Sequence, residues 1–342
     1  MGNLPKFKPD PSLKLMDQVR QVMRYHHYAL TTEKTYCKWI LRFIRYYDAK
    51  RHPRDMGAPE IEAFLSHLST KVKVSASTQR QALNAIIFLY KSVLDIPIEA
   101  SITPIRAKRR KRLPVVMSQS ETRQVLNQMR GQHLLMAELL YGAGLRLMEC
   151  VRLRTSSIDL QRSILYVRFG KGGKDRTVPL PASLDEKLKS QLEKVRHLHS
   201  ADLDEGFGEA CLPEAFARKI GSAAYDFGWQ YLFPSKKRSI DPISGRERRY
   251  HVFRTGLQKA VRAAVKRAGL TKRITCHTFR HSYATHLLEN GVNIRIVQEL
   301  MGHADVKTTE IYTHVMQKDL SAVVSPLDTL RHAPQSDSVR PL

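Results

Sequence analysis

The chain has 342 residues, of which 42% are hydrophobic, which is enough for two domains that each bury a core. Its 57 Lys and Arg against 32 Asp and Glu give a formal net charge of +25, which indicates a polyanionic partner such as nucleic acid. No strongly basic amphipathic helix with an aromatic face favours a membrane surface instead, and no apolar run reaches membrane-spanning length. The four cysteines are scattered and the N-terminus lacks an apolar signal core, so we expect a cytoplasmic protein with reduced thiols and no membrane partner.

Residues 12–103 show the helical spacing of apolar side chains and no strand pattern. This domain follows a Pro- and Lys-rich segment, residues 1–11, that we expect to be a flexible arm. The pattern and its breaks predict a small helical bundle with helices over residues 13–28, 31–47, 60–68 and 75–94.

A basic linker is predicted at residues 104–116. Residues 1–112 carry 22 basic and 9 acidic side chains, and six of the basic ones are Arg106, Lys108, Arg109, Arg110, Lys111 and Arg112. Like charges this close repel one another and do not form a core. We expect the linker to lie on nucleic-acid phosphates, the alternative being a solvated connector.

Residues 117–330 mix helices with a small sheet. A capping box at Ser118 and Glu121 opens the first helix, and an apolar helix over residues 134–141 ends at Gly142-Ala-Gly144. The runs 163–168 and 176–180 predict a β-hairpin with a basic tip. A helix over residues 184–198, an irregular segment at about 200–249 and further helices from residue 253 complete the domain, and residues 331–342 are expected to be a disordered tail.

A cluster of chemically active side chains lies within residues 277–312: His277, Arg280, His303 and Tyr312. Arg and His stabilise the charge that develops on the oxygens of a phosphodiester under attack, and Tyr312 would be the nucleophile. A phenol needs a base or dense positive charge to become reactive, which these groups would supply. The cluster indicates breakage and rejoining of nucleic acid, although Tyr312 could also form a buried aromatic pair with Ile311.

Residues distant in sequence extend this cluster. Arg146 and Glu149 are three apart and share a helix face, and Lys171 stands at the hairpin tip. Taken alone, the first two form a surface ion pair and the lysine is solvated. His277 with His281, or His303 with His314, could instead suggest zinc, but no third acidic or thiol ligand follows at helical spacing.

The motifs closely resemble the catalytic signatures of tyrosine recombinases over residues 12–330. They are Gly144-Leu-Arg146, Gly170-Lys171-Gly, His277-Thr-Phe-Arg280-His281, Leu300-Met-Gly-His303 and Thr309-Glu-Ile-Tyr312. The resemblance implies a SAM-like α-helical N-terminal bundle and a mainly α, mixed α/β catalytic domain with a small antiparallel sheet. It implies that Tyr312 forms a 3′-phosphotyrosine bond and releases a 5′-hydroxyl. Arg146 and Arg280 would hold the phosphate, His303 would hydrogen-bond to it, Lys171 would be the general acid, His277 would handle protons and Glu149 would support the network.

The irregular segment narrows the resemblance to integron integrases, which hold unpaired bases of a folded attC hairpin with such an insertion. Trp229, Pro242 and His251 match the base-holding positions, with Trp229 stacking on a base. Lys174 in the hairpin tip is a further expected DNA contact. Tyr250 departs from the His-His pair common in that family, and Trp229 could alternatively be a core aromatic.

The resemblance further implies a DNA clamp that recombines gene cassettes between duplex attI and single-stranded attC sites in a bacterial, nucleoid-associated setting. It implies a homo-tetramer on two sites, in which each protomer donates residues 317–330 to a neighbour. The phosphotyrosine conserves the bond energy, so no ATP, metal or other cofactor is expected. The alternatives are a recombinase of the chromosome-dimer-resolution or phage type acting on duplex sites, and a non-catalytic DNA-binding protein.

Overall fold

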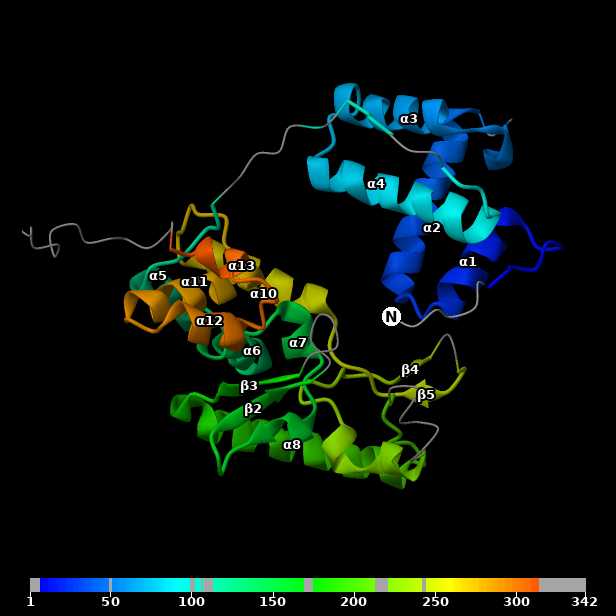
Figure 1. Ribbon diagram of the computed structural model, residues 1–342. Helices are drawn as coiled ribbons and strands as arrows, with labels where there is room; N and C mark the ends of the chain where they lie inside the picture. Colours follow the sequence, from blue (N-terminus) through cyan, green and yellow to red (C-terminus); the bar gives the residue numbers. More distant parts are fainter. Residues whose placement is uncertain are drawn as a thin grey trace, which may run out of the picture. The chain divides into compact units, whose positions relative to one another are not determined.

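The computed structural model describes residues 7–48, 51–98, 102–105, 107, 113–168, 175–212, 221–241 and 244–313 (Figure 1). The chain divides into two compact units, with the boundary between Arg112 and Leu113. None of the helices in the described segments is long and apolar enough to cross a bilayer.

The first unit is a helical bundle, and the predicted helices are all present. They are α1 (Leu15–Tyr25), α2 (Leu30–Tyr46), α3 (Ala58–Thr70) and α4 (Ala76–Phe88), and no strand occurs among the described residues before 110. Ser75 caps α4 by accepting a hydrogen bond from the Thr78 backbone N–H. The last predicted turns differ, because Leu89–Leu94 continue α4 as a π-helix that ends at Asp95 in the left-handed conformation.

The second unit packs helices against a three-stranded antiparallel sheet, as predicted. The helices are α5 (Gln119–Asn127), α6 (Gly131–Gly142), α7 (Leu147–Val151), α8 (Asp185–Asp204), α10 (Arg254–Arg267), α11 (Cys276–Glu289), α12 (Ile294–Met301) and α13 (Lys307–Glu310). The strands are β1 (Ile158–Asp159), β2 (Ile164–Val167) and β3 (Arg176–Pro179), in the order β1-β2-β3. The capping box at Ser118 and Glu121 is present at the start of α5.

A close approach between α6 and α11 brings distant parts of the sequence together. Gly144, with φ +60°, lies against the ring of Tyr283 on α11, and a Cβ at this position would come within 2.5 Å of the ring. Only glycine accepts both the positive φ and this contact. The turn after α6 therefore places Arg146, at the start of α7, beside Arg280 on α11.

The segment between α8 and α10 is more ordered than predicted. Helix α8 continues to Asp204, six residues past its expected end and into the irregular segment. It is followed by the 3-10 turns Gly221–Tyr225 and Phe227–Trp229 and by an antiparallel pair of short strands, β4 (Ser239–Ile240) and β5 (Glu247–Arg248), which lies near the end of α8 in Figure 1.

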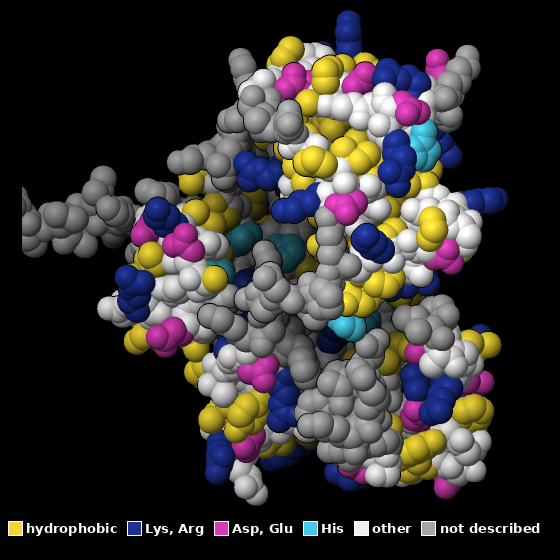
Figure 2. Space-filling model, turned by 45° about the vertical axis from the view of Figure 1, so that its right-hand side comes forward, with side chains coloured by type: hydrophobic (Ala, Val, Ile, Leu, Met, Phe, Trp, Pro, Cys, Tyr) yellow, Lys and Arg dark blue, Asp and Glu magenta, His cyan; other side chains and the backbone are white. Residues whose placement is uncertain are grey.

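Acidic side chains neutralise the arginines of this segment. Asp202 at the end of α8 forms ion pairs with Arg238 at 2.9 Å and with Arg249 at 2.5 Å, and Glu209 pairs with Arg248 at 2.5 Å. Acidic and basic side chains are also interspersed on the face in Figure 2. These arginines therefore hold in place a segment for which the sequence predicted no regular structure.

Candidate active site

Glu149 lies at the centre of the charged cluster. Its Oε1 accepts from Arg146 Nη1 at 2.7 Å and its Oε2 from the Arg146 backbone N–H at 2.8 Å. Arg176, the first residue of β3, donates Nη1 and Nη2 to the same two oxygens at 3.0 and 2.8 Å. The Glu149 side chain is only 8% exposed. The alternative of an isolated surface ion pair between Arg146 and Glu149 is therefore wrong, because Arg176 brings a second guanidinium and the carboxylate is buried.

The arginines determine the ionisation of Glu149. Burial by itself would raise the pKa of this carboxyl, but the hydrogen bonds and charge of Arg176, followed by those of Arg146, lower it to about 2. Arg280 Nη1 lies 3.9 Å from the same carboxylate. Three guanidiniums around one ionised carboxylate leave net positive charge available for a phosphate.

Arg280 is buried and held by backbone carbonyls. It donates to the carbonyl oxygens of Gly144 and Met301, and its Nη2 lies 3.4 Å from Nε2 of His303. Burial, followed by the nearby charge of Arg146, lowers the pKa of Arg280 to about 9, so the guanidinium stays charged at neutral pH. The Gly144 turn, α11 and the end of α12 thus meet at one cation.

The imidazoles around Arg280 are neutral. Burial, followed by the charges of Arg280 and Arg146, lowers the pKa of His303 to about 4, and its Nδ1 lies 2.9 Å from Oγ1 of Thr309. His277, the most exposed of the group, also has a pKa lowered by burial and by these arginines. A neutral imidazole can donate one hydrogen bond to a phosphate oxygen without adding a charge.

Tyr312 is 2% exposed and packs among Tyr283, Val297 and Met301. Its hydroxyl lies 3.0 Å from Nδ1 of His281. Burial raises the pKa of the phenol, and the charges of Arg280 and Arg146 offset only part of this rise. The expectation that surrounding charge favours the phenolate does not hold in this structure, because desolvation outweighs it. The alternative of a buried pair with Ile311 is wrong, since Ile311 is 36% exposed.

The contacts of Arg176 and His281 were not predicted from the sequence. Arg176 and the buried Val178 are two residues apart in β3, so their side chains point to the same face of the strand. An arginine on the inward face of the predicted hairpin was the sequence feature that could have indicated an internal ion pair. His281 was part of a quoted motif and a possible zinc ligand with His277, but it was given no role, whereas the structure directs its Nδ1 to Tyr312. Lys171, Lys174, Pro242, His314 and the linker residues Arg109, Arg110, Lys111 and Arg112 lie outside the described residues.

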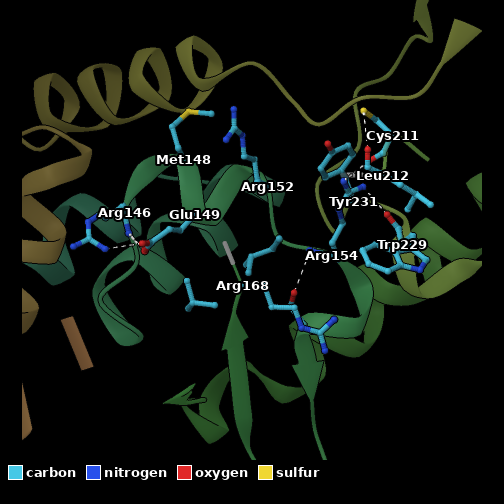
Figure 3. Close-up of a pocket in the computed structure, with 13 residues that line it drawn as sticks. Arg146, Met148, Glu149, Arg152, Arg154, Arg168, Cys211, Leu212, Trp229 and Tyr231 are labelled. Carbon is cyan, nitrogen blue, oxygen red and sulfur yellow. Dashed lines mark hydrogen bonds and ion pairs between the residues drawn. The ribbon is translucent and has the colours of Figure 1, made fainter. Parts of the chain in front are cut away.

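A pocket of about 560 Å³ joins the charged cluster to Trp229. In Figure 3, Arg146 and Glu149 lie at one end and Trp229 and Tyr231 at the other, with Arg152, Arg154 and Arg168 between them. Trp229 is half-buried and lines this pocket, so the core-aromatic alternative is wrong.

Arg154 builds the wall of the pocket. Its guanidinium lies 3.7 Å from the centroid of the Tyr231 ring and donates to the carbonyls of Trp229 at 2.6 Å and Cys211 at 2.8 Å. His251 is not among the lining residues. It meets Tyr231 edge-on at 5.2 Å, and its Nδ1 lies 2.8 Å from the Val252 carbonyl. The pocket therefore brings together Trp229 and Arg146, but not His251.

Known proteins match this chain over most of its length. The "Phage integrase family" model matches residues 114–319 and the "Phage integrase, N-terminal SAM-like domain" model matches residues 15–100. An integrase/recombinase of Escherichia coli is 45% identical over 324 residues, which is 94% of this chain and 95% of the relative. A tyrosine recombinase of Pseudothermotoga lettingae is 32% identical over 280 residues, 80% and 83% of the two chains.

A solved structure shows the same fold. It is the site-specific recombinase XerH bound to its difH substrate before cleavage, with a TM-score of 0.59, 20% identity, and coverage of 91% of this chain and 84% of that one. The expected fold, a SAM-like helical bundle followed by a mostly helical catalytic domain with small antiparallel sheets, is confirmed. The chain belongs to the phage integrase family and is a tyrosine site-specific recombinase, an enzyme that cleaves and rejoins DNA.

Proposed function

We propose that this recombinase is an integron integrase, which exchanges gene cassettes between duplex attI and folded single-stranded attC sites. The observation that carries the proposal is the pocket shared by Trp229 and Arg146. A base that protrudes from a hairpin could stack on Trp229 while the backbone beside it reaches the charged cluster. Duplex DNA with every base paired would leave that pocket unused.

In the proposed chemistry, Tyr312 attacks the scissile phosphate. The new bond joins its phenolic oxygen to phosphorus, the bond from phosphorus to the 5′-oxygen breaks, and a 3′-phosphotyrosine forms. Arg146 and Arg280 bind the non-bridging oxygens, and His303 donates a hydrogen bond to one of them. This arrangement is supported by the contact of both arginines with the Glu149 carboxylate and by the position of His303 beside Arg280.

Proton transfers complete the proposed step. Lys171, from the hairpin tip, would protonate the departing 5′-oxygen, and His277, as a neutral imidazole, would take up the proton that the Tyr312 phenol loses. Rejoining runs the same step in reverse with the 5′-hydroxyl of another strand. Because the phosphotyrosine keeps the energy of the broken bond, the reaction needs no ATP.

Access to the phosphate requires Tyr312 to move. The hydroxyl now contacts His281 and the ring is almost fully buried. Tyr312 lies in the turn that follows the four-residue helix α13. We propose that DNA binding releases the phenol from His281 and brings it next to the arginines, where the phosphate replaces the lost packing.

The remaining assignments complete the proposal. Residues 1–11 serve as an arm, 12–103 as the core-binding domain, 104–116 as the linker on DNA phosphates, 117–330 as the catalytic domain and 331–342 as a tail. Two sites are held by a homo-tetramer whose protomers exchange residues 317–330. Lys174 in the hairpin tip, Pro242 in the insertion at about 200–249 and His251 just after it are further proposed DNA contacts.

The test compares the two separated strands of an attC-like hairpin with attI duplex, measuring both affinity and covalent adduct. We expect one hairpin strand to bind and react best. Stacking of a base on an aromatic contributes about 1–3 kcal/mol. Trp229→Ala should therefore weaken the binding of that strand by roughly 5- to 150-fold and leave the binding of duplex attI nearly unchanged.

A matched control is Tyr225→Ala, which removes an aromatic ring that is 47% exposed in the same insertion and does not line the pocket. It should leave strand preference intact, and Trp229→Phe should retain much of it. Equal binding and reaction on both strands and on duplex would refute the integron assignment and favour a recombinase of duplex sites.

A further inference from the structure

We infer that Arg176 is a positioning residue for strand cleavage, which orients Glu149 and fastens the backbone before His303 to the sheet. The inference rests on the proposed roles of Arg146, Glu149 and His303. Arg176 would not touch the DNA. It would act by holding the groups that do.

The contacts of Arg176 all point into the protein. Its Nη1 and Nη2 form a bidentate pair with Glu149, and its Nε donates to the Leu300 carbonyl at 2.8 Å. The side chain is 9% exposed. A guanidinium is the only side chain that can hold a carboxylate with two parallel hydrogen bonds and still donate sideways to a third acceptor. The side chain is thus committed to internal contacts.

The bidentate pair with Arg176 limits how strongly the Glu149 carboxylate pairs with Arg146 and Arg280. While Arg176 occupies both oxygens, the carboxylate accepts one side-chain bond from Arg146 and lies 3.9 Å from Arg280. Without Arg176, the same negative charge would be available to pair fully with Arg146 and Arg280. Those two arginines would then be partly neutralised and turned away from a phosphate.

The Leu300 contact extends the effect to His303. Leu300 lies in the last turn of α12, and Gly302 ends that helix with φ +58°. A Cβ on Gly302 would lie 3.0 Å from Cδ of Arg176, so the backbone of Gly302 packs directly against the arginine side chain. His303 follows directly. Any shift of Arg176 is therefore transmitted to the imidazole beside Arg280.

Arg176 also anchors one end of the hairpin. It is the first residue of β3 and pairs in register with Val167 of β2. Glu149, the end of α12 and the sheet are thus joined at a single side chain. Displacing a catalytic group by about 1 Å can slow a reaction roughly 100-fold. We expect a loss of this order when Arg176 is truncated.

The experiment measures single-turnover cleavage of a nicked suicide substrate at saturating protein, together with DNA affinity, thermal stability and the pH profile. Arg176→Ala should cleave about 100-fold more slowly while its affinity for DNA changes by less than about threefold. Added guanidinium ion at millimolar concentration should restore part of the rate, whereas sodium chloride at equal ionic strength should not. Arg176→Lys should retain partial activity, since an ammonium supplies charge without the bidentate geometry.

The pH profile separates positioning from mere stability. In Arg176→Ala the Glu149 carboxyl loses its main partner and neutralises Arg146 and Arg280, so protonation of this carboxyl should restore part of the cleavage rate as pH falls towards 5, while wild type stays level over that range. Arg162→Ala, which removes an exposed arginine from the turn between β1 and β2, is the matched control and should behave as wild type. Lost cleavage with neither guanidinium rescue nor a relative gain in rate at lower pH would overturn the inference, as would an unimpaired Arg176→Ala. Absence of any Tyr312 adduct in wild type would instead refute the proposed chemistry itself.

Discussion

Replacing Glu149 by Gln tests how strongly the charged cluster stabilises the catalytic unit. The structure lowers the pKa of this carboxyl from its ordinary 4.5 to about 2. One pKa unit corresponds to about 1.4 kcal/mol, so ionised Glu149 contributes about 3 kcal/mol at neutral pH. The side chain is 8% exposed, and solvent screening therefore removes little of this value. We expect Glu149→Gln to lower the free energy of unfolding by about that amount.

The pH dependence of this difference follows from the sign of the shift. The native carboxyl stays ionised down to about pH 2, whereas in the unfolded chain it binds a proton near 4.5. The stabilisation is therefore complete above 4.5 and is lost as the pH falls from there towards 2. The difference between wild type and Glu149→Gln should be the same at about pH 7 and pH 5.5, and smaller at about pH 3.5.

Urea unfolding followed by tryptophan fluorescence measures this difference. The chain has two tryptophans, Trp39 in the first unit and Trp229 in the second. A Trp39→Phe background would leave Trp229 as the reporter of the catalytic unit. Glu193→Gln is the control, because Glu193 is 58% exposed and its ion pairs on α8 contribute little. A Glu149→Gln effect as small as the control, or one that disappears between pH 7 and 5.5, would refute the reasoning.

Further substitutions and pH test other parts of the structure. Gly144→Ala forces a Cβ into the Tyr283 ring at positive φ and should destabilise the protein by about 3 kcal/mol or more in a thermal scan. Gly206 also has a positive φ, +80°, but open space around it, so Gly206→Ala should cost only about 1 kcal/mol. Similar costs for the two variants would contradict the packing argument. Asp202→Asn removes the shared partner of two arginines and should speed proteolysis within residues 205–249 while sparing cleavage of duplex attI, and unchanged proteolysis would argue against the ion-pair network. His303 has a pKa near 4, so the cleavage rate should show no midpoint near pH 6.5, and such a midpoint would mean that the imidazole titrates as an exposed histidine does.

Local sequence signals predicted the parts of the fold that depend on neighbouring residues. The β-rich runs on either side of a glycine-rich turn indicated the hairpin, and Ser75 and Ser118 marked helix starts because a cap needs only the next three residues. His277 and Arg280 could be placed together for the same reason, since they share one turn of α11.

Contacts between distant segments were not predictable in this way. Arg176, the partner of Glu149 on β3, lies 27 residues away in the sequence. To predict this pair one must know which face of the strand Arg176 is on and the register of the sheet. The ion pairs of Arg238, Arg248 and Arg249 could not be predicted, because nothing local shows that Asp202 and Glu209 fold against these arginines. The raised pKa of Tyr312 depends on how tightly α12 and α11 pack around it, which composition does not give.

The most direct measurement identifies the residue that becomes attached to DNA. Wild-type protein would be incubated with a nicked suicide substrate, and the adduct digested with nuclease and trypsin for mass spectrometry. Residues 308–318 form one tryptic peptide in which Tyr312 is the only tyrosine. We predict a nucleotide on Tyr312, and no adduct from Tyr312→Phe although that variant still binds DNA. An adduct that persists in Tyr312→Phe, or a nucleotide on another residue, would contradict the proposed mechanism.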